Sequence, residues 1–528
     1  MPNVNTLLRE HVTLKVEMPD RIFLNGYVAK LQEPDQLSWF LCQHREEEIP
    51  RYELLGRMTR DFVAAVEAYA VERAVPMVQF EKGQRKEEVA RRYFQAAERE
   101  GRYGVVMIGV TQERANVFRP PARRQRQVGK FAAHRNAAFV KHFYLYVRDQ
   151  DFGPTFIRFC TYAPFGIRVW LNGHSWLVER LRRSGHQVTT LDNAISWVDD
   201  PEALRRLCRR FGPQHLQRYF DRWISFLPNP FTAYDRAGGY TYQLSILQLE
   251  IADTRVFDRP QHGRQFFEEV IRDHLDLGRP DQIQIVFGGG PKRSWRQHPP
   301  RTRVFAQGVH PSLQVAYRNT RVKQYYKHGR ALRTETTFHD TRDFGVGKKI
   351  ENLPRRIELG RQINARLLDL ELQTQPPTAA ASQFERIVMP SGQPGRRAPG
   401  LRFGDPRVVA LYAALARFEV AVGGFRAGDL QPLVAAYRGA DYSMPQMGYD
   451  LRRLRRNGLI ERMPSSHRYR LTPEGRRLVP FSSKLYSRAV CGGLARLQPE
   501  HAPTSLGNAA RAYDEAVAAH LVKTRLCA

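Results

Sequence analysis

The chain is 528 residues long, and its 83 Lys and Arg residues outnumber its 53 Asp and Glu residues, which gives a formal net charge of +30. Hydrophobic residues make up 42% and charged residues 26% of the sequence, a globular composition that excludes disorder as an account of the whole chain. At about 150 residues per domain, this length predicts roughly three to four domains. The charge imbalance favours a polyanionic partner, and we therefore expect DNA, RNA or both to bind.

Several classes of protein are disfavoured by the same sequence. No apolar run reaches the length of about 18 residues that a membrane-spanning helix needs, so no membrane partner is expected. Arg9, Glu10 and Glu17 interrupt the start, where a signal peptide would need an apolar core, which predicts a cytoplasmic, nucleoid-associated protein. The five cysteines are scattered without a CxxC pair, so we expect reduced thiols rather than disulfides or a zinc ribbon. The oligomeric state stays open.

Residues 1–118 alternate strand and helix signals and are expected to form an N-terminal α/β domain. Apolar residues with a period of two predict two short strands, and Asn25-Gly26 is a candidate turn. The expected elements are strands at 12–16, 21–28, 75–80 and 104–110, and helices at 51–72 and 86–99.

Residues 119–235 are expected to form a middle α+β domain that begins with the basic, proline-marked loop RPPARRQRQVGK. This loop is typical either of a solvated surface or of an arm that contacts phosphates. Its contacts would come from Arg123, Arg124, Arg126 and Lys130. Further along, aromatic runs at 139–147 and 153–162 predict a hairpin, and residues 201–224 a helix.

Residues 236–373 are expected to form a third α/β domain. Strands are predicted at 243–251, at 282–287 and twice within 312–339, and helices at 265–275 and 353–372. Residues 374–400 are rich in Pro, Ala, Ser and Gly, which is typical of a linker. The fold class is thus a multidomain α/β body, with α+β as the alternative, followed by a domain at 401–485 and a helical tail at 486–528.

The domain at 401–485 carries closely spaced helix signals. Asp405 and Pro406 begin a predicted helix that reaches residue 422, and Asp429 caps a second at 430–437. Ser443 begins a third helix that Gly458 ends. Its apolar stripe consists of Met447, Leu451 and Leu454. Two short strands around 459–460 and 468–471 follow, and Thr472-Pro473 begins a last helix.

This order of elements, with the phrase YDLRRLRRNGLIERMPSSHRYRLTPEGRRLV, resembles the winged helix-turn-helix family. The resemblance implies a third helix that enters the major groove of DNA and a hairpin that reaches the neighbouring backbone. Winged helices also serve as protein–protein modules, so a pure interaction role is the alternative. The expected nucleic-acid contacts are Arg452, Arg453, Arg455, Arg456, Arg468 and Arg470.

A first candidate for catalysis follows the strand at 75–80. The chain contains no GxxxxGK[ST], HExxH or GxSxG motif, which disfavours P-loop, zinc-protease and α/β-hydrolase chemistry. Glu81 could hold Mg²⁺ while Lys82 steadies the attacking water or the phosphate, as in half of a metal-dependent nuclease site. A charged turn that begins the next helix is the alternative. No cofactor is certain, and Mg²⁺ is expected only if catalysis occurs.

A second candidate combines Lys323, Tyr325 and Lys327 with the later Leu-Arg-x-Glu segment that ends at Glu335. This arrangement is similar to rolling-circle replication initiators, although their His-x-His metal motif is missing. The resemblance implies Tyr325 or Tyr326 as a nucleophile and Glu335 as a metal-binding carboxylate, and Asp340 is a further candidate ligand. A structural pair between Arg333 and Glu335 is the alternative. The remaining acidic candidates are Glu250, Asp253 and Asp258.

Residues 1–372 resemble basic bacterial proteins of unassigned function that end in the same winged helix, which implies a mobile-element or defence setting. The leading hypothesis is a nucleic-acid-binding protein of a mobile-element or genome-maintenance type. Its winged helix and basic body would hold DNA or structured RNA, and its enzymatic version adds Mg²⁺-dependent phosphodiester cleavage or strand transfer. The alternative is a large winged-helix transcriptional regulator without catalytic activity.

Overall fold

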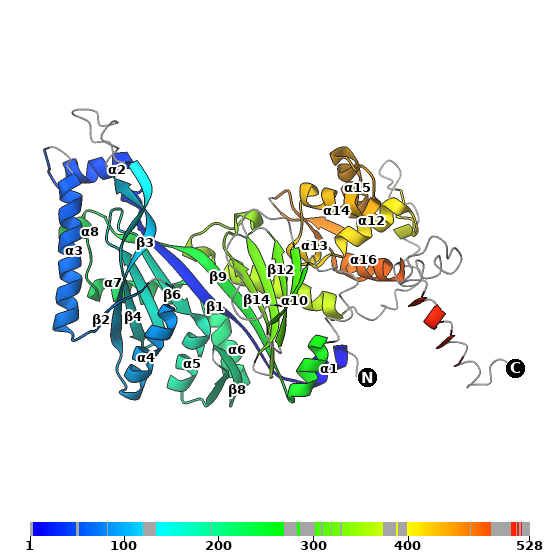
Figure 1. Ribbon diagram of the computed structural model, residues 1–528, viewed down its shortest axis with the longest axis horizontal. Coiled ribbons are helices and arrows are strands. Elements are labelled where there is room, and N and C mark those ends of the chain that lie inside the picture. The colour runs from blue at the N-terminus through cyan, green and yellow to red at the C-terminus, as the bar shows by residue number, and fades with distance from the viewer. Residues whose placement is uncertain are drawn as a thin grey trace. The chain divides into compact units, whose positions relative to one another are not determined.

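The chain folds into two compact units in the computed structural model (Figure 1). Unit 1 comprises Met1–Val12, Phe257–Thr334 and Gln362–Ala528, and unit 2 comprises Thr13–Val256 and Glu335–Arg361. The domain boundaries predicted near residues 118 and 235 therefore fall inside unit 2. The structure describes residues 4–48, 52–81, 83–119, 134–191, 193–268, 282–285, 301–307, 310–317, 319–327, 330–372, 387–388, 399–464, 466–486 and scattered positions in 508–519.

A large mixed sheet forms the centre of unit 2, which agrees with the predicted α/β class. Its strands follow the order β9-β1-β6-β5-β4-β3-β2, and residues 335–338 of β14 (Ala331–Phe338) lie beside β9. Neighbours from β1 to β3 pair antiparallel, whereas β2 and β3 pair parallel. The strands are β1 (Val12–Val28), β2 (Met77–Gln79), β3 (Gly104–Arg119), β4 (His134–Asp149), β5 (Gly153–Cys160), β6 (Ile167–Asn172) and β9 (Tyr242–Phe257).

Strand β1 corrects one sequence prediction. Residues 12–28 form a single long strand, and the predicted turn at Asn25-Gly26 is wrong. Asn25 pairs with Arg168 and Gly26 with Ile167, so the antiparallel ladder to β6 continues through both residues. A Cβ atom at Gly26 would lie 3.2 Å from Cβ of Ile167, which is tighter than most contacts. Gly26 thus allows a close approach of β6 rather than a reversal of the chain.

Two helices of unit 2, α3 and α7, cover one face of this sheet. The Phe62 ring of α3 packs against Phe143 and Phe159, and the Tyr219 hydroxyl of α7 lies 2.7 Å from that of Thr155. On the opposite face, α4 buries Ala90 and Ala97 against Tyr144 and Tyr146 of β4. The helices and short elements are η1 (Ala29–Leu31), α2 (Pro34–Trp39), η2 (Phe40–His44), α3 (Tyr52–Glu72), α4 (Lys86–Arg99), α5 (Gly173–Arg183), β7 (Val188–Leu191), β8 (Ala194–Val198), α6 (Pro201–Arg210), α7 (Pro213–Phe226), α8 (Ala233–Ala237), η4 (Arg342–Phe344) and η5 (Ile350–Asn352).

The helix predicted at 201–224 is divided in the structure. Asp200 caps α6, which ends at Arg210, and Gly212 precedes Pro213 at the start of α7. Proline has no backbone N–H and is tolerated at the first position of a helix but not in its interior. The break at Gly212-Pro213 follows from this rule.

In unit 1, the strands follow the order β10-β11-β12-β13-β14, where β14 contributes residues 331–334. β10 and β11 are parallel, while β12 and β13 form an antiparallel hairpin, so the stretch 312–339 holds three strands instead of two. A core of Leu7, Leu8, Phe257, Phe266 and Phe267 packs nearby with Tyr326. The bounds are α1 (Val4–Glu10), β10 (Gln282–Ile285), β11 (Arg301–Gln307), β12 (His310–Tyr317), β13 (Thr320–Lys327) and α10 (Leu353–Leu372), whose residues from 362 onward belong to unit 1.

The last described part of unit 1 is a helical segment with a small hairpin. The predicted caps Asp405, Ser443 and Thr472 each accept a hydrogen bond from a backbone N–H in the helix that follows. Asp429 is instead the third residue of its helix, and the helix predicted at 406–422 is interrupted after Leu415. The elements are α12 (Pro406–Leu415), α13 (Phe418–Gly423), α14 (Ala427–Arg438), α15 (Met444–Arg456), β15 (Ile460–Arg462), β16 (Tyr469–Leu471) and α16 (Pro473–Leu485).

Within the described residues, no helix has both the length and the apolar character needed to cross a bilayer. The predicted linker at 374–400 and helical tail at 486–528 lie almost entirely outside the described residues, and so they remain predictions.

Candidate functional site

An open cavity of about 560 Å³ lies over five neighbouring strands of unit 2: β1, β6, β5, β4 and β3. None of the described residues that line it is acidic. Three of its four arginines are exposed, and the fourth, Arg158, keeps 13% of its side chain exposed. The polar lining side chains are Asn25, Arg114, Asn116, Arg135, Arg158 and Arg168.

The register of the sheet brings two of these arginines together. Arg158 of β5 lies directly opposite Arg168 of β6, which in turn lies opposite Asn25 of β1. Like charges directly opposite one another destabilise an antiparallel pair of strands. Partial burial, followed by repulsion from Arg158, lowers the pKa of Arg168. The sheet thus concentrates positive charge at the cavity, where an anion would relieve the repulsion.

One carboxylate compensates part of this charge from the edge of the cavity. Glu113 accepts hydrogen bonds from Nη1 of Arg158 at 2.6 Å and from the Tyr144 hydroxyl at 2.8 Å, and it also forms an ion pair with Lys86. Burial opposes ionisation of Glu113, but the bonds from Lys86 and Tyr144 and the charge of Arg158 lower its pKa overall. Glu113 therefore holds Arg158 in place, while Arg114 and Arg168 face the cavity.

A row of aromatic side chains adjoins the arginines. Phe23 of β1 pairs with Trp170 of β6, which pairs with Phe156 of β5, two residues along each strand from Asn25, Arg168 and Arg158. The Phe156 and Trp170 rings are stacked, with centroids 6.0 Å apart and planes 11° apart. All three rings are half-buried. They offer apolar surface beside a positively charged cavity.

Three carboxylates from adjacent strands converge at the end of this row. Asp20 of β1, Glu250 of β9 and Glu335 of β14 have oxygen atoms that all lie within 4.8 Å of one another, and their residues are at most 8% exposed. Asn172 and Asn193 donate hydrogen bonds to Asp20 at 2.7 and 2.6 Å. Grouped carboxylate oxygens of this kind are ligands for Mg²⁺.

Hydrogen bonds also fix the position of Glu250. Thr337 of β14 donates one at 3.1 Å, and Nε of Arg21 lies 3.9 Å from the carboxylate. Side chains alternate between the faces of a strand, so Arg21, Phe23 and Asn25 point to the same face of β1. At about 3.3 Å per residue, Arg21 and Asn25 are about 13 Å apart along the strand. Arg21, the aromatic row and the arginines of the cavity therefore follow one another along one face of unit 2, and Arg21 approaches Glu250 of the carboxylate group.

Comparison with known proteins found no matching family model and no match among curated proteins or solved structures. The functional argument for this chain accordingly rests on its own residues and their geometry.

His142 should make the stability of the folded protein depend on pH. Its side chain is fully buried, and burial, followed by the charge of Arg158, lowers its pKa from 6.5 to about 4. In the unfolded chain, His142 takes up a proton at about pH 6.5, so stability is fully present above that pH and is lost as the pH falls toward 4. We expect the free energy of unfolding to fall by up to about 3 kcal/mol over this range.

Denaturant unfolding followed by circular dichroism between pH 7 and 4 measures this loss. The His142→Gln variant keeps a side-chain donor for the carbonyl of Val140, which lies 2.9 Å from Nδ1, but it cannot be protonated. The variant should therefore show a smaller loss than the wild-type protein. Equal losses in the two proteins would remove His142 as the cause.

The two catalytic candidates Glu81 and Glu335 do not meet in one metal site. Glu81 is exposed and follows β2 at one edge of the sheet, whereas Glu335 lies in β14 beyond β9. Seven strand spacings of about 4.8 Å separate them, a distance of about 30 Å that no single metal ion bridges. Lys82 lies outside the described residues. The partners of Glu335 are instead Asp20 and Glu250.

Asp340 and Asp253 also lie outside the carboxylate group. Asp340 pairs with Arg342 at 2.7 Å and Lys348 at 3.8 Å. Although burial opposes this, hydrogen bonds from Arg342 hold its pKa at about 2. Asp253 pairs with Arg255 at 3.1 Å. Asp340 is thus not placed with Glu335 in the carboxylate group, and its metal role stays a prediction.

The residues of β13 that were predicted as nucleophile or nucleic-acid contacts are partly or fully buried. Tyr325 belongs to unit 1, is half-buried and lies under the Nζ of Lys323, which is 4.2 Å from the ring centroid. Lys327 is only 8% exposed, so we withdraw it as a surface contact for a polyanion. The basic loop with Arg123, Arg124, Arg126 and Lys130 lies outside the described residues and stays a prediction.

Two of the six predicted arginine contacts in the C-terminal segment are structural. Arg453 is 8% exposed and donates to the carbonyls of Pro399 and Gly400, and Arg468 is fully buried and donates to those of Gly423 and Gly424. The predicted nucleic-acid contacts of both residues are therefore wrong, because a guanidinium that donates to buried carbonyls is not free to reach phosphate. Arg470 pairs with Glu461. The exposed contacts that remain are Arg452, Arg455 and Arg456.

Proposed function

We propose that the protein binds a nucleic-acid strand along the face of unit 2 that carries the arginine-lined cavity. The main support for this proposal is that Arg158 lies directly opposite Arg168 at the cavity. None of the described residues that line the cavity is acidic. Guanidinium groups match phosphate oxygens with paired donors, so phosphates would relieve the repulsion between the two side chains. The net charge of +30 adds long-range attraction for the same polymer.

The adjacent aromatic row favours a single strand over a duplex. Phe23, Trp170 and Phe156 present half-buried rings beside the arginines, and unpaired bases stack on such rings regardless of sequence. The bases of a duplex are stacked on each other and are not available for this contact. We therefore assign single-stranded DNA or RNA, or an unpaired segment of a structured RNA, to this face.

The C-terminal segment of unit 1 supports a second nucleic-acid contact of the winged-helix type. Its element order is similar to that family's, and an isolated antiparallel bridge joins Phe425 to Tyr469 of the hairpin of β15 and β16. Helix α15 exposes Arg452, Arg455 and Arg456 and buries its apolar stripe. In this proposal α15 contacts a duplex while unit 2 holds a strand.

A second candidate function, hydrolysis of a phosphodiester, is favoured by the carboxylates that converge near Arg21. Asp20, Glu250 and Glu335 would hold Mg²⁺ there, and Arg21 lies about 13 Å along β1 from Asn25 of the cavity. A water oxygen would bond to phosphorus while one P–O ester bond breaks, and a proton from that water would end on the departing oxygen. This candidate distinguishes an enzyme from a regulator, which needs no such group.

A salt titration of binding by the full-length protein tests the proposed function. Four arginines that contact phosphates should give a slope of log Kobs against log salt of about −3 for a single strand. Fluorescence anisotropy with labelled oligonucleotides of mixed sequence, single-stranded and double-stranded, measures this slope without Mg²⁺. An affinity that does not change with salt, or that is undetectable for every oligonucleotide, would refute the proposal.

A further inference from the structure

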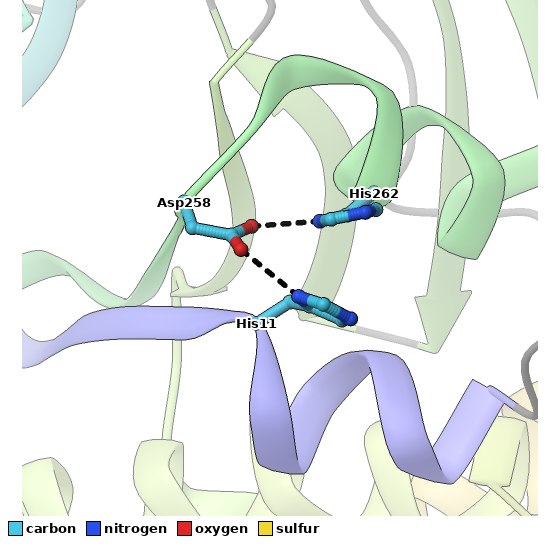
Figure 2. A group of neighbouring side chains, drawn as sticks. All are labelled: His11, Asp258 and His262. Carbon is cyan, nitrogen blue, oxygen red and sulfur yellow. Dashed lines mark hydrogen bonds and ion pairs between the residues drawn. The ribbon is translucent and has the colours of Figure 1, made fainter.

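His11, Asp258 and His262 form a compact polar group in unit 1 (Figure 2). His11 lies between α1 and β1, Asp258 follows β9, and His262 belongs to the first turn of a helix over residues 260–268. Nδ1 of His11 lies 2.9 Å from one carboxylate oxygen of Asp258, and Nδ1 of His262 lies 2.7 Å from the other. The two ring centroids are only 3.8 Å apart.

The backbone around the group is held in place by hydrogen bonds and by a core. The N–H of Asp258 donates to the carbonyl of His11 at 2.9 Å, and the N–H of His262 donates to that of Arg259 at 3.2 Å. One buried cluster lies close in sequence to these positions. It contains Leu7, Leu8, Phe257, Phe266 and Phe267. The three side chains are therefore brought together by packed segments that are distant in sequence, which is how preorganised ligand sets are built.

We propose that this group binds one Zn²⁺ ion through Nδ1 of His11, Nδ1 of His262 and a carboxylate oxygen of Asp258. Two imidazoles and a carboxylate are an established ligand set for zinc, with water at the fourth position. Two ligand atoms about 2.0–2.1 Å from a tetrahedral ion are about 3.3 Å apart. The hydrogen-bonded atoms, now 2.7 and 2.9 Å apart, need to separate by only about half an ångström.

Proton balance and access also agree with a metal ion. Each ring places Nδ1 against a carboxylate oxygen of Asp258. For the ion to bind, each Nδ1 gives up its proton to solvent and its lone pair takes the ion, while Nε2 carries the proton of the neutral ring. Figure 2 shows the outer nitrogens of both rings directed away from the carboxylate. The side chains keep 27%, 35% and 15% exposure, which leaves a path for the ion and a water ligand.

Metal binding to the full-length protein tests the site. The protein, treated with chelator and dialysed, is titrated with Zn²⁺ by calorimetry, and Co²⁺ is added separately because imidazole and carboxylate ligands change its visible absorption. We expect one high-affinity ion per chain. His262→Asn should weaken Zn²⁺ binding by at least about 100-fold, since even a side chain that only supports a metal ligand contributes 10–100-fold.

A matched control exists in unit 2, where His186 lies 3.1 Å from Asp199; among the described residues, neither belongs to a group of three side chains that could hold a metal ion. His186→Asn should bind Zn²⁺ as the wild-type protein does. Equal Zn²⁺ affinity of His262→Asn and the wild-type protein would overturn the proposal. If His262→Asn does not fold, the Co²⁺ spectrum of the wild-type protein decides, because a spectrum identical to that of Co²⁺ in buffer also overturns it.

Discussion

Replacing both Arg114 and Arg168 with alanine is expected to weaken binding of single-stranded nucleic acid at least tenfold at about 0.1 M salt. Both residues are exposed and line the cavity, and hydrogen bonds to charged groups contribute about 1.5–3 kcal/mol each. The loss of two phosphate contacts should also reduce the slope of log Kobs against log salt by about 1 to 1.5. Anisotropy titrations at several salt concentrations measure both quantities.

The control for this variant changes the same amount of charge elsewhere in unit 2. Arg205→Ala with Arg209→Ala removes two arginines from α6 that are 64% and 66% exposed and pair with Glu202. These side chains do not line the cavity. If the control weakens binding as much as the double variant at the cavity, the attraction is a property of the total charge and not of this site.

The second large effect concerns the carboxylates. Glu335→Gln is expected to reduce Mg²⁺-dependent cleavage of single-stranded nucleic acid about 1,000-fold, because metal ions contribute several kcal/mol to such reactions and each 1.36 kcal/mol is a factor of ten. The amide keeps the size of the side chain but removes the charge that the ion requires. Cleavage of an end-labelled oligonucleotide, with Mg²⁺ and with chelator, measures the change.

Asp253→Asn is the matched control for Glu335→Gln, since Asp253 is also a buried carboxylate but pairs with Arg255 and lies outside the converging group. It should cleave at the wild-type rate. Thermal melting of both variants shows whether unit 2 remains folded. Equal cleavage by Glu335→Gln and the wild-type protein would remove the carboxylates from catalysis and favour the regulator.

The sequence identified some members of the site but not their partners. Glu335 and Glu250 were singled out, yet Glu335 was grouped with Asp340, because charge patterns along a chain do not show the order of strands in a sheet. Asp20 was missed because β1 reaches β9 only through pairing between segments more than 200 residues apart. Asp20 lies between the strands predicted at 12–16 and 21–28 and directly before Arg21, so the sequence pattern did not mark it as buried.

The arginines show the same limit at the level of single side chains. Helix periodicity correctly predicted the buried stripe of α15 and its exposed Arg452, Arg455 and Arg456. It could not predict that the chain at 399–400 packs over Arg453, because that contact comes from outside the helix. Likewise, the row of Phe23, Trp170 and Phe156 exists only through strand register, which a single sequence does not show.

The central claim, that a strand of nucleic acid lies across the arginine-lined cavity of unit 2, is tested most directly by photo-crosslinking. The full-length protein is irradiated with a single-stranded oligonucleotide that carries halogenated pyrimidines, and crosslinked peptides are identified by mass spectrometry. We expect crosslinks in the peptides that hold Phe23, Phe156 and Trp170 beside Arg158 and Arg168. Crosslinks found only in α15 and the hairpin of β15 and β16, with none in these strands, would contradict it.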